Sequence, residues 1–376
     1  MTHSRRKALE VLGLTLALSG LGLPVAAHDS DDDDGFRSGH VFTISNAVAG
    51  NELLVYAAPR GGAISLAARL ATNGQGTGGG LGNQGAVTLA GNGRFLFVVN
   101  ALSNSVSTFA VRRGGVELRS TVGSGGERPI SVTERDGLVY VLNANGVGNV
   151  TGFRNVDGTL KPVAGSTQPL SAASGTGSAQ VGISPDGDVL LVTEKATNKL
   201  TSYRVRGDGR LDAPVVTASA GVTPFGFAFD RRGNALVSEA FGGAAGASTV
   251  SSYAFEDRAP AVPSVVSARV ADTQTAACWV VTTPNGRYAY VTNTGSGTIS
   301  SYNIQRSGKL TLAQAIAATS GAGPIDAALS ADGRGLFVLN AGGRSITSFG
   351  VARDGTLTPA DSATGLPAGA NGLAAN

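Results

Sequence analysis

One aromatic residue recurs seven times along this chain, and no other feature limits the possible folds as strongly. Each member ends a short stretch of alternating small polar and apolar residues, and successive members are 44 to 53 residues apart. Regular spacing of this length is typical of repeat architectures, in which each unit is one supersecondary element. The series consists of Tyr56, Phe109, Phe153, Tyr203, Tyr253, Tyr302 and Phe349.

The unit around each aromatic residue is all strand. An apolar stretch ending in Asn is followed by a polar loop, the aromatic-ended stretch and a Gly turn, as in 288–293, 298–302 and 307–308. Period-2 alternation indicates half-buried strands, and no segment shows a helical period. Four-stranded units repeated radially form a propeller, whereas a solenoid or sandwich would need a shorter repeat or fewer strands. The sequence therefore predicts an all-β fold, a seven-bladed β-propeller of four-stranded blades.

The two ends of the repeat region complement each other. The first unit begins at its second strand, 41–46, and has no inner strand before it. The stretch 371–375 matches the inner strand expected at 326–330, which precedes the last complete unit. We therefore expect the C-terminal strand to complete the first blade and close the ring.

The N-terminal 27 residues have the pattern of a signal peptide. Basic residues at 5–7 precede an apolar stretch at 11–23 and the small pair Ala26-Ala27. Ser4 to Leu9 also fit a twin-arginine signal loosely, and the apolar stretch is too short for a transmembrane helix. We expect residues 1–27 to be a signal peptide, 28–40 an acidic flexible tail and 41–376 the propeller, in a periplasmic or secreted protein.

Charge and cysteine content narrow the possible partners. Three of the 29 basic and one of the 26 acidic residues lie in the signal, which leaves 26 and 25. Such a balance gives no reason to expect nucleic acid or an anionic membrane as partner. Cys278 is the only cysteine, so no intramolecular disulfide can form, and a buried apolar role is its simplest interpretation. We expect a monomer without a membrane span.

The turn motifs carry a family resemblance. Pro185-Asp-Gly187 and Pro284-Asn-Gly286 precede second strands, and Asp208-Gly-Arg-Leu211 and Asp354-Gly-Thr-Leu357 follow third strands. Across 41–376 these repeats resemble the lactonase-type propellers, the family of 6-phosphogluconolactonase and carboxymuconate-lactonizing enzymes. Tyr290-Val-Thr-Asn293 is similar to the repeat of the YVTN propellers of surface-layer proteins.

The resemblance implies a lactonase activity, but the functional residues of the family differ here. Its Pro-Arg-His stretch aligns with Ser178-Ala179-Gln180, which lacks both ionisable groups. Its Asn-Glu pair falls on Glu194-Lys195, so the glutamate is either lost to Lys195 or displaced by one residue to Glu194.

The residues themselves exclude several chemistries. His3, His28 and His40 are the only histidines, and the propeller body has none. Nucleophilic triads and His-ligated zinc, iron or copper sites are therefore not expected, and no cofactor or metal is assigned. Gly74 to Gly79 match the dinucleotide fingerprint formally, but a strand follows them, which indicates a blade-to-blade connection.

The acidic tail leaves two interpretations open. His28 with the five aspartates that follow it could chelate Ca²⁺ or Cu²⁺ after cleavage. The more common structural role of such a run is a solvated spacer.

The mouth of the central channel is the expected ligand site, because the inner strands and the loops entering them converge there. Repeat alignment predicts an inner ring of Ala86, Ile130, Gln180, Gly226, Trp279, Asp326 and Asn371. Neighbouring loops contribute Arg128, Glu194, Lys195 and Glu239. From these we select as ligand-binding candidates Arg128, Gln180, Lys195, Glu239, Trp279 and Asn371.

Two carboxylates are candidates for catalysis. Asp326 and Glu194 could serve as acid and base, although buried carboxylates more often bind backbone amides or cap turns. Glu194 stands where other units have Asn46, Asn100, Asn143, Asn293 and Asn340, which we interpret as turn residues that bond their own backbone. Trp279, the only tryptophan, could stack on a sugar or aromatic ring or fill the channel.

Two hypotheses from different classes follow. The first is a binding or structural propeller of the cell envelope that holds a small molecule, glycan or protein on one face. The alternative is a lactone hydrolase that opens a sugar or muconate-type lactone at the channel mouth. Glu194 or Asp326 would then activate water, and Arg128 or Lys195 would hold the oxyanion. A quinone- or metal-dependent dehydrogenase is a weaker third hypothesis, since the body lacks histidine and paired cysteines.

Overall fold

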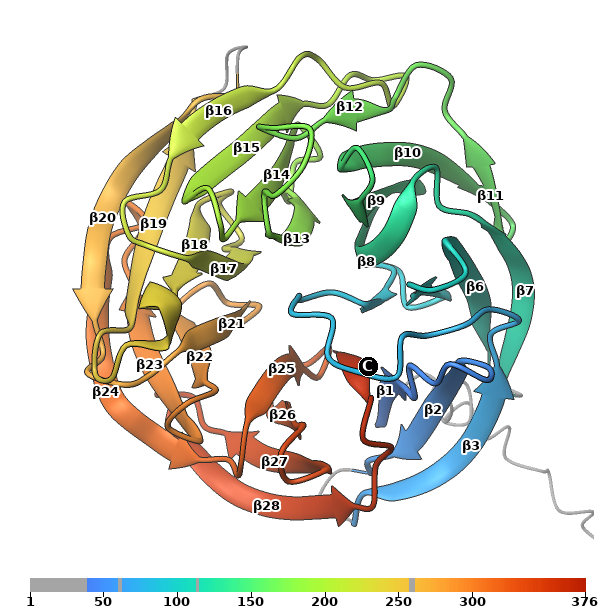
Figure 1. Ribbon diagram of the computed structural model, residues 1–376. Coiled ribbons are helices and arrows are strands. Elements are labelled where there is room, and N and C mark those ends of the chain that lie inside the picture. The colour runs from blue at the N-terminus through green and yellow to red at the C-terminus, as the bar shows by residue number, and fades with distance from the viewer. Residues whose placement is uncertain (1–38, 60–62, 113–114, 257–260) are drawn as a thin grey trace, which may run out of the picture. The chain divides into compact units, whose positions relative to one another are not determined.

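Seven antiparallel sheets are arranged around a common axis (Figure 1), which confirms the predicted propeller. The computed structural model describes residues 39–59, 63–112, 115–256 and 261–376. The predicted signal peptide and most of the predicted tail lie outside this range. From the axis outward, blade 1 consists of β29 (Asn371–Ala375), β1 (His40–Ile44), β2 (Glu52–Ala57) and β3 (Ser65–Ala71).

The other six blades follow in chain order, each starting at its inner strand. Blade 2 contains β4 (Val87–Leu89), β5 (Phe95–Asn100), β6 (Ser105–Arg112) and β7 (Gly115–Gly123). Blade 3 contains β8 (Glu127–Arg135), β9 (Leu138–Asn145), β10 (Asn149–Val156) and an outer strand in two pieces, β11 (Thr159–Pro162) and β12 (Gln168–Pro169). Blade 4 contains β13 (Ser178–Ile183), β14 (Val189–Glu194), β15 (Lys199–Arg204) and β16 (Val215–Ala218).

Blades 5 to 7 have the same order. Blade 5 contains β17 (Pro224–Phe229), β18 (Ala235–Glu239), β19 (Thr249–Phe255) and β20 (Pro263–Ala271). Blade 6 contains β21 (Ala277–Thr282), β22 (Tyr288–Asn293), β23 (Thr298–Ile304) and β24 (Leu310–Thr319). Blade 7 contains β25 (Pro324–Leu329), β26 (Gly335–Asn340), β27 (Ser345–Val351) and β28 (Leu357–Thr364).

The ring closes as the sequence predicts. Strand β29 pairs antiparallel with β1, with Val41 opposite Ala375 and Ile44 opposite Asn371. Outside the strand pair, the His40 amide donates to Oδ1 of Asn376 at 2.9 Å. The first strand therefore begins at His40, a residue that the sequence analysis places in the tail.

The recurring aromatic residues form the core between the sheets. Each lies on the third strand of its blade, and each is at most 4% exposed. Some of the tyrosines also bind the preceding blade: the Tyr203 hydroxyl donates to Pro169 O at 2.8 Å, and the Tyr302 hydroxyl donates to Val270 O at 3.3 Å. Burial of a ring of this size contributes about 1.5–3 kcal/mol, which explains why the aromatic residue recurs.

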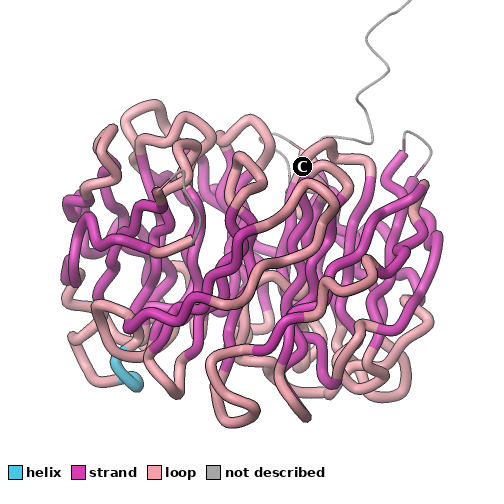
Figure 2. Tube along the Cα trace, turned by 90° about the horizontal axis from the view of Figure 1, so that it is seen from above, coloured by secondary structure: helices cyan, strands magenta, loops and turns pink. Residues whose placement is uncertain are grey.

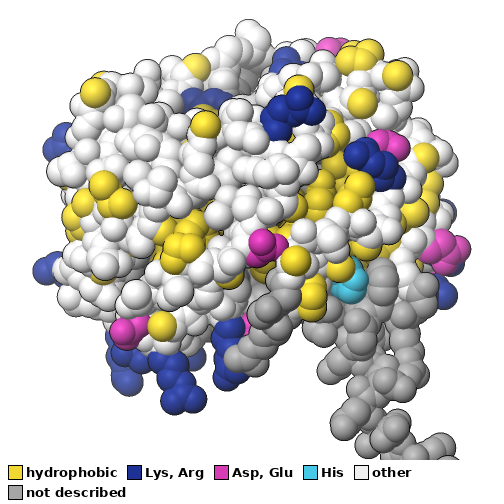
Figure 3. All heavy atoms as spheres, turned by 90° about the horizontal axis from the view of Figure 1, so that it is seen from below, with side chains coloured by type: hydrophobic (Ala, Val, Ile, Leu, Met, Phe, Trp, Pro, Cys, Tyr) yellow, Lys and Arg dark blue, Asp and Glu magenta, His cyan; other side chains and the backbone are white. Residues whose placement is uncertain are grey.

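The ring has two different faces. The loop face carries the connections that enter the inner strands and the loops between second and third strands, one of which contains the short 3₁₀ helix η1 (Phe241–Gly243). The turn face carries the turns between inner and second strands. In the side view of Figure 2, η1 marks the edge that belongs to the loop face. Figure 3 shows hydrophobic side chains in bands on one side of the ring, and Lys and Arg side chains projecting from one rim. Within the described residues, no helix has the length and hydropathy needed to cross a bilayer.

Removal of residues 369–376 is expected to lower the melting temperature strongly. The deletion takes away β29 with its buried Leu373, leaves β1 as an unpaired inner edge and exposes apolar residues such as Val41 that belong to the same cluster as Leu373. Thermal unfolding followed by circular dichroism measures the effect. A melt equal to that of the full chain would contradict closure by β29.

Candidate functional site

The second strands end in buried polar residues that bind the third strand and neighbouring loops. The Asn100 amide donates to Ser105 and Ser107 at 3.2 and 2.8 Å, and Asn293 and Asn340 make the equivalent bonds in blades 6 and 7. The interpretation of these asparagines as turn residues bonding their own backbone is therefore wrong. Strand pairing also shows that Ser45, and not Asn46, occupies this position in blade 1.

Glu194 and Glu239 occupy the same position in blades 4 and 5. Both are fully buried. Glu194 accepts hydrogen bonds from the amide of Ser171 at 2.9 Å, from the Ser171 hydroxyl, and from Thr197 and Thr201 at 2.9 and 2.6 Å. These four donors leave the carboxylate little capacity to bind a substrate or a water molecule.

Glu239 is held in a similar way. It accepts from the Gly221 amide at 2.7 Å, from the Thr249 hydroxyl and from the Ser251 hydroxyl at 2.7 Å. Burial raises the pKa of Glu239, and these hydrogen bonds and Arg269 oppose that rise. Each glutamate therefore links the connection that precedes its blade's inner strand to the third strand of that blade. The asparagines have the same role in other blades.

Asp326 has a different environment on the inner strand of blade 7. Its side chain is 2% exposed; Oδ1 accepts from the Ala327 amide at 2.8 Å, and Oδ2 has no hydrogen-bond partner within the described residues. Burial raises the pKa of Asp326 well above its usual range, although the amides of Ala327, Leu373 and Gly85 and the indole of Trp279 oppose the shift. Burial thus favours the protonated form of this carboxyl.

Equivalent positions on the seven inner strands form an axial ring around the channel. Strand pairing places Ser131 rather than the expected Ile130 in this ring, because Ile130 is the bulge residue of β8, as Ala179 and Cys278 are in blades 4 and 6. The axial ring is therefore Ala86, Ser131, Gln180, Gly226, Trp279, Asp326 and Asn371.

Two glutamines bridge inner strands across this ring. Gln180 pairs with the main chain of the next blade, donating to Phe227 O at 2.9 Å and accepting from Phe227 N at 2.6 Å. Gln84, from the connection between β3 and β4, pairs with Val280 of blade 6 at 3.0 and 3.3 Å. A Cβ at Gly226 would overlap the Gln84 carboxamide, so a glycine is required there. Gln84 thereby ties the connection before blade 2 to the inner strand of blade 6.

Trp279 and Asn371 are buried in the ring. Trp279 is 3% exposed, and its ring packs against Phe225 with centroids 5.0 Å apart. This packing favours the interpretation of Trp279 as a channel filler over that of a stacking platform. Asn371 is 2% exposed, and its carbonyl accepts from the Thr43 hydroxyl at 3.2 Å.

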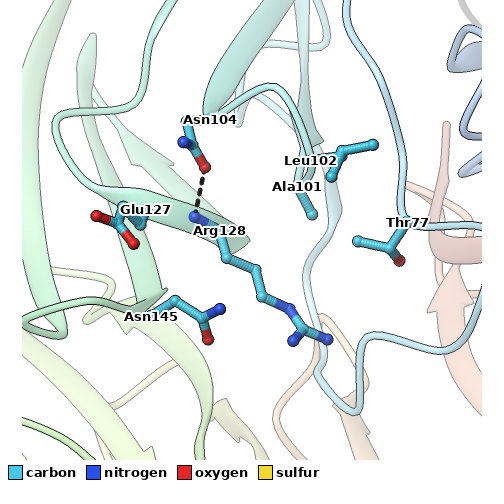
Figure 4. Close-up of a pocket in the computed structure, with 7 residues that line it drawn as sticks. All are labelled: Thr77, Ala101, Leu102, Asn104, Glu127, Arg128 and Asn145. Carbon is cyan, nitrogen blue, oxygen red and sulfur yellow. Dashed lines mark hydrogen bonds between the residues drawn. The ribbon is translucent and has the colours of Figure 1, made fainter.

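Two of the predicted ligand residues lie together on the loop face. Arg128 extends into an open cavity of about 290 Å³, lined also by Thr77, Leu102 and Asn145 (Figure 4). Its guanidinium has no ion-pair partner among the described residues, and its backbone amide donates to Asn104 at 2.7 Å. Figure 4 shows the guanidinium directed away from Glu127, which lies on the far side of the cavity.

Lys195 adds a second cation near this cavity. It donates to the carbonyl of Gly82, in the connection that also supplies Thr77, and lies 4.4 Å from the ring centroid of Phe225. Burial lowers the pKa of Lys195 to about 8; the Cys278 thiol opposes this shift, and repulsion by Arg128 adds to it.

Arg128 has a left-handed backbone, with φ of 55°. The corresponding residues of blades 4 to 7, which are Gly177, Thr223, Ala276 and Gly323, also have positive φ. The conformation is therefore a property of the repeat. A non-glycine residue in this left-handed conformation costs about 1 kcal/mol. In blade 3 that residue is Arg128, whose guanidinium faces the solvent.

The remaining sequence predictions concern reactive groups. Cys278 is buried, and burial raises its pKa to about 11, so it is a thiol at neutral pH. No group of three or more His, Cys, Asp or Glu residues in the described parts of the chain is arranged to hold a metal ion.

Sequence reasoning missed Gln84 and its role. The connection at 72–86 differs in length and composition from the other blade connections, so repeat alignment assigns it no position. The one available signal is a pair of amide residues, Asn83 and Gln84, within a glycine-rich segment. In the structure both are buried, although the segment leaves the sheet.

Comparison with known proteins gives one family. The family described as "Lactonase, 7-bladed beta-propeller" matches residues 49–168, 147–258 and 247–371. Among curated proteins, no sequence relative is found.

Solved structures share the fold at low sequence identity. A functionally unknown protein from Desulfotomaculum acetoxidans aligns with a TM-score of 0.69 and 15% identity, over 89% of this chain and 98% of that one. A putative 6-phosphogluconolactonase from Bacteroides uniformis gives 0.67 and 17%, over 88% and 98%. A periplasmic gluconolactonase from Pseudomonas aeruginosa gives 0.66 and 18%, over 88% and 98%.

Glu194→Gln is expected to destabilise the fold. The substitution turns an NH₂ group toward one of four donors, which costs about 2 kcal/mol. A fall of several degrees in the melting temperature would be seen by scanning calorimetry. Glu127→Gln, at an exposed carboxylate on the loop face, is the matched control and should leave the melt unchanged. An unchanged melting temperature for Glu194→Gln would mean that the four hydrogen bonds contribute little to stability. Glu194 would then again be a candidate catalytic residue.

Proposed function

Because the chain belongs to the seven-bladed lactonase family, we propose that it is a non-hydrolytic member that binds a small sugar acid on its loop face. The single observation that carries the proposal is the position of Arg128, an unpaired guanidinium in an open cavity with Lys195 nearby. Two cations bind a carboxylate, and the hydroxyl and amide groups of Thr77 and Asn145 suit the hydroxyls of the same ligand.

The buried carboxylates are poorly placed to act as a general base in hydrolysis, which supports a binding role. Glu194 is held by four donors and Glu239 by three, and Asp326 does not line the cavity of Arg128. A general base must reach the water or proton on which it acts. None of these three groups meets that condition at the cavity of Arg128.

We place the protein at the cell envelope, in the periplasm or outside the cell. The signal-like pattern of residues 1–27 supports this location. One structural relative, the gluconolactonase of Pseudomonas aeruginosa, is itself described as periplasmic.

Lactone hydrolysis is the second candidate function, and family membership favours it. In that case Asp326 would act from the channel, because its Oδ2 atom has no hydrogen-bond partner. A pH-stat assay with aldono- and aromatic lactones tests this function. Turnover that is lost in Asp326→Asn would establish the hydrolase and overturn the proposal of a non-hydrolytic protein.

Arg128→Gly is expected to separate binding from stability. The glycine relieves the left-handed strain and should raise stability by about 1 kcal/mol, whereas loss of the guanidinium should weaken D-gluconate binding at least tenfold. Titration calorimetry and thermal melts measure the two effects. Ala276→Gly relieves the same conformation in blade 6 and should leave gluconate affinity unchanged. Equal affinity in wild type and Arg128→Gly would place the ligand elsewhere.

Gluconate binding should weaken as the pH rises through about 8. Lys195 is charged below its lowered pKa of about 8 and neutral above it, so its attraction for a carboxylate disappears with rising pH. Affinity measured from pH 6.5 to 9.5 gives the profile. Lys195→Arg remains charged and should flatten it. A flat wild-type profile would remove Lys195 from the site.

A further inference from the structure

The near balance of charge in the whole chain hides an excess of cations in the propeller. Five aspartates and one arginine lie in the predicted tail, so residues 41–376 contain 25 basic and 20 acidic residues. Figure 3 shows Lys and Arg side chains projecting from the lower rim, which the opposite view in Figure 2 identifies as the turn face. The turn face of blades 5 to 7 therefore needs an account of its charges.

Seven exposed cations lie on the described turns of these three blades. The turns between inner and second strands carry Arg231, Arg232, Arg287 and Arg334. The turns between third and outer strands lie on the same face, because neighbouring strands run antiparallel. They add Arg306, Lys309 and Arg353. The described parts of these turns hold three exposed carboxylates, so positive charge is in excess; they are Glu256, Asp332 and Asp354.

Blades 3 and 4 neutralise their arginines on the same face. Each of four arginines there pairs with an aspartate of its own blade, and the pairs are Arg135–Asp136, Arg204–Asp188, Arg206–Asp212 and Arg210–Asp208. None of the seven cations of blades 5 to 7 has an ion pair with a described residue. Like charges that lack counter-charges repel one another, and a bound anion removes this repulsion.

The turns hold successive arginines in the same backbone position. The Arg287 amide donates to Oδ1 of Asn285, and the Arg334 amide donates to Oδ1 of Asp332, both at 2.9 Å. In blade 4 the equivalent residue after the turn glycine is an aspartate, Asp188. The repeat therefore presents a cation at this position in blades 6 and 7 and an anion in blade 4.

The turns of the three blades also touch one another. A Cβ at Gly286 of blade 6 would lie 2.8 Å from Cγ of Arg231 in blade 5. A Cβ at Gly333 of blade 7 would lie 2.7 Å from Cδ of Pro284 in blade 6. The cations of blades 5, 6 and 7 thus belong to one continuous surface, which we call the basic arc.

The chemistry of the basic arc limits its partner. A single small anion engages one or two of the cations, whereas a chain of anionic units engages several at once and gains avidity. Arginine suits carboxylate groups, which it binds in pairs of hydrogen bonds. The exposed side chains of Asn285, Gln305 and Ser307 lie in the same turns and suit hydroxyl groups. The turns contain no aromatic residue on which a nucleic acid base would stack.

We propose that the basic arc binds an acidic polysaccharide, whose carboxylates pair with the arginines and whose hydroxyls bind the polar side chains between them. The arc lies at the opposite ends of the strands from Arg128. The proposal is therefore independent of the proposed function of the loop face.

Titration calorimetry with alginate oligomers, a chain of uronic acids, tests the proposal. The wild type should bind alginate and not the uncharged glucan dextran. Affinity should fall about tenfold from about 50 to about 300 mM NaCl, because ions screen exposed charge pairs. A triple variant with Arg232→Gln, Arg306→Gln and Arg334→Gln removes one exposed cation from each blade and should bind alginate about tenfold more weakly.

The matched control removes the same charge from the same face. It carries Arg135→Gln, Arg206→Gln and Arg210→Gln, which replace arginines that are already paired, and its alginate affinity should stay within about twofold of wild type. Both triple variants should bind D-gluconate as the wild type does, which separates the arc from the loop face.

Three outcomes would overturn the proposal. The first is no binding of alginate by the wild type. The second is an equal loss of affinity in the two triple variants, since net charge alone would then explain the binding. The third is binding to phosphatidylglycerol vesicles or duplex DNA without binding to alginate, which would assign the arc to a lipid or nucleic acid partner.

Discussion

The inner edge of each blade presents a row of peptide groups that no further strand can pair. Seven such edges meet at the axis of this protein, and an unpaired buried peptide group is costly. The chain meets this constraint with side chains: Ser131 and Gln180 bind the inner strand of the next blade, and Gln84 reaches across the ring to Val280. These contacts hold the inner strands of neighbouring blades together around the axis.

The same constraint explains where sequence reasoning succeeded and where it failed. The number of blades, the closing strand and most of the axial ring could be predicted because they repeat. A position that is ambiguous in one blade can be identified from the equivalent residues of the others. The ring residue of blade 3 was missed by one position, since Ile130 is the bulge residue of β8 and Ser131 is the residue that pairs with Leu142. The contact of Gln84 with Val280 comes from a connection that has no counterpart in other blades, so nothing in the sequence pattern predicted it.

Comparison between blades was also misleading for a buried carboxylate. Glu194 differed from the asparagines of other blades and therefore looked like a functional residue. In the structure it binds hydroxyls of the third strand as Asn100 does, with the direction of the hydrogen bonds reversed. The hydroxyl-rich third strands accommodate either residue type, because a hydroxyl both donates and accepts. Arg128 was recognisable from its loop position, although its left-handed backbone was not.

The pairing of β29 with β1 joins residues more than 300 positions apart in the chain. Contacts of such separation slow folding, because a large loop must close before they form. During synthesis, blades 2 to 7 emerge in order and can each assemble from adjacent segments, whereas blade 1 lacks its inner strand until residues 371–375 have been made. Until then β1 has an open edge that a foreign strand can pair with, so the nascent chain is most exposed to aggregation before its last strand is made.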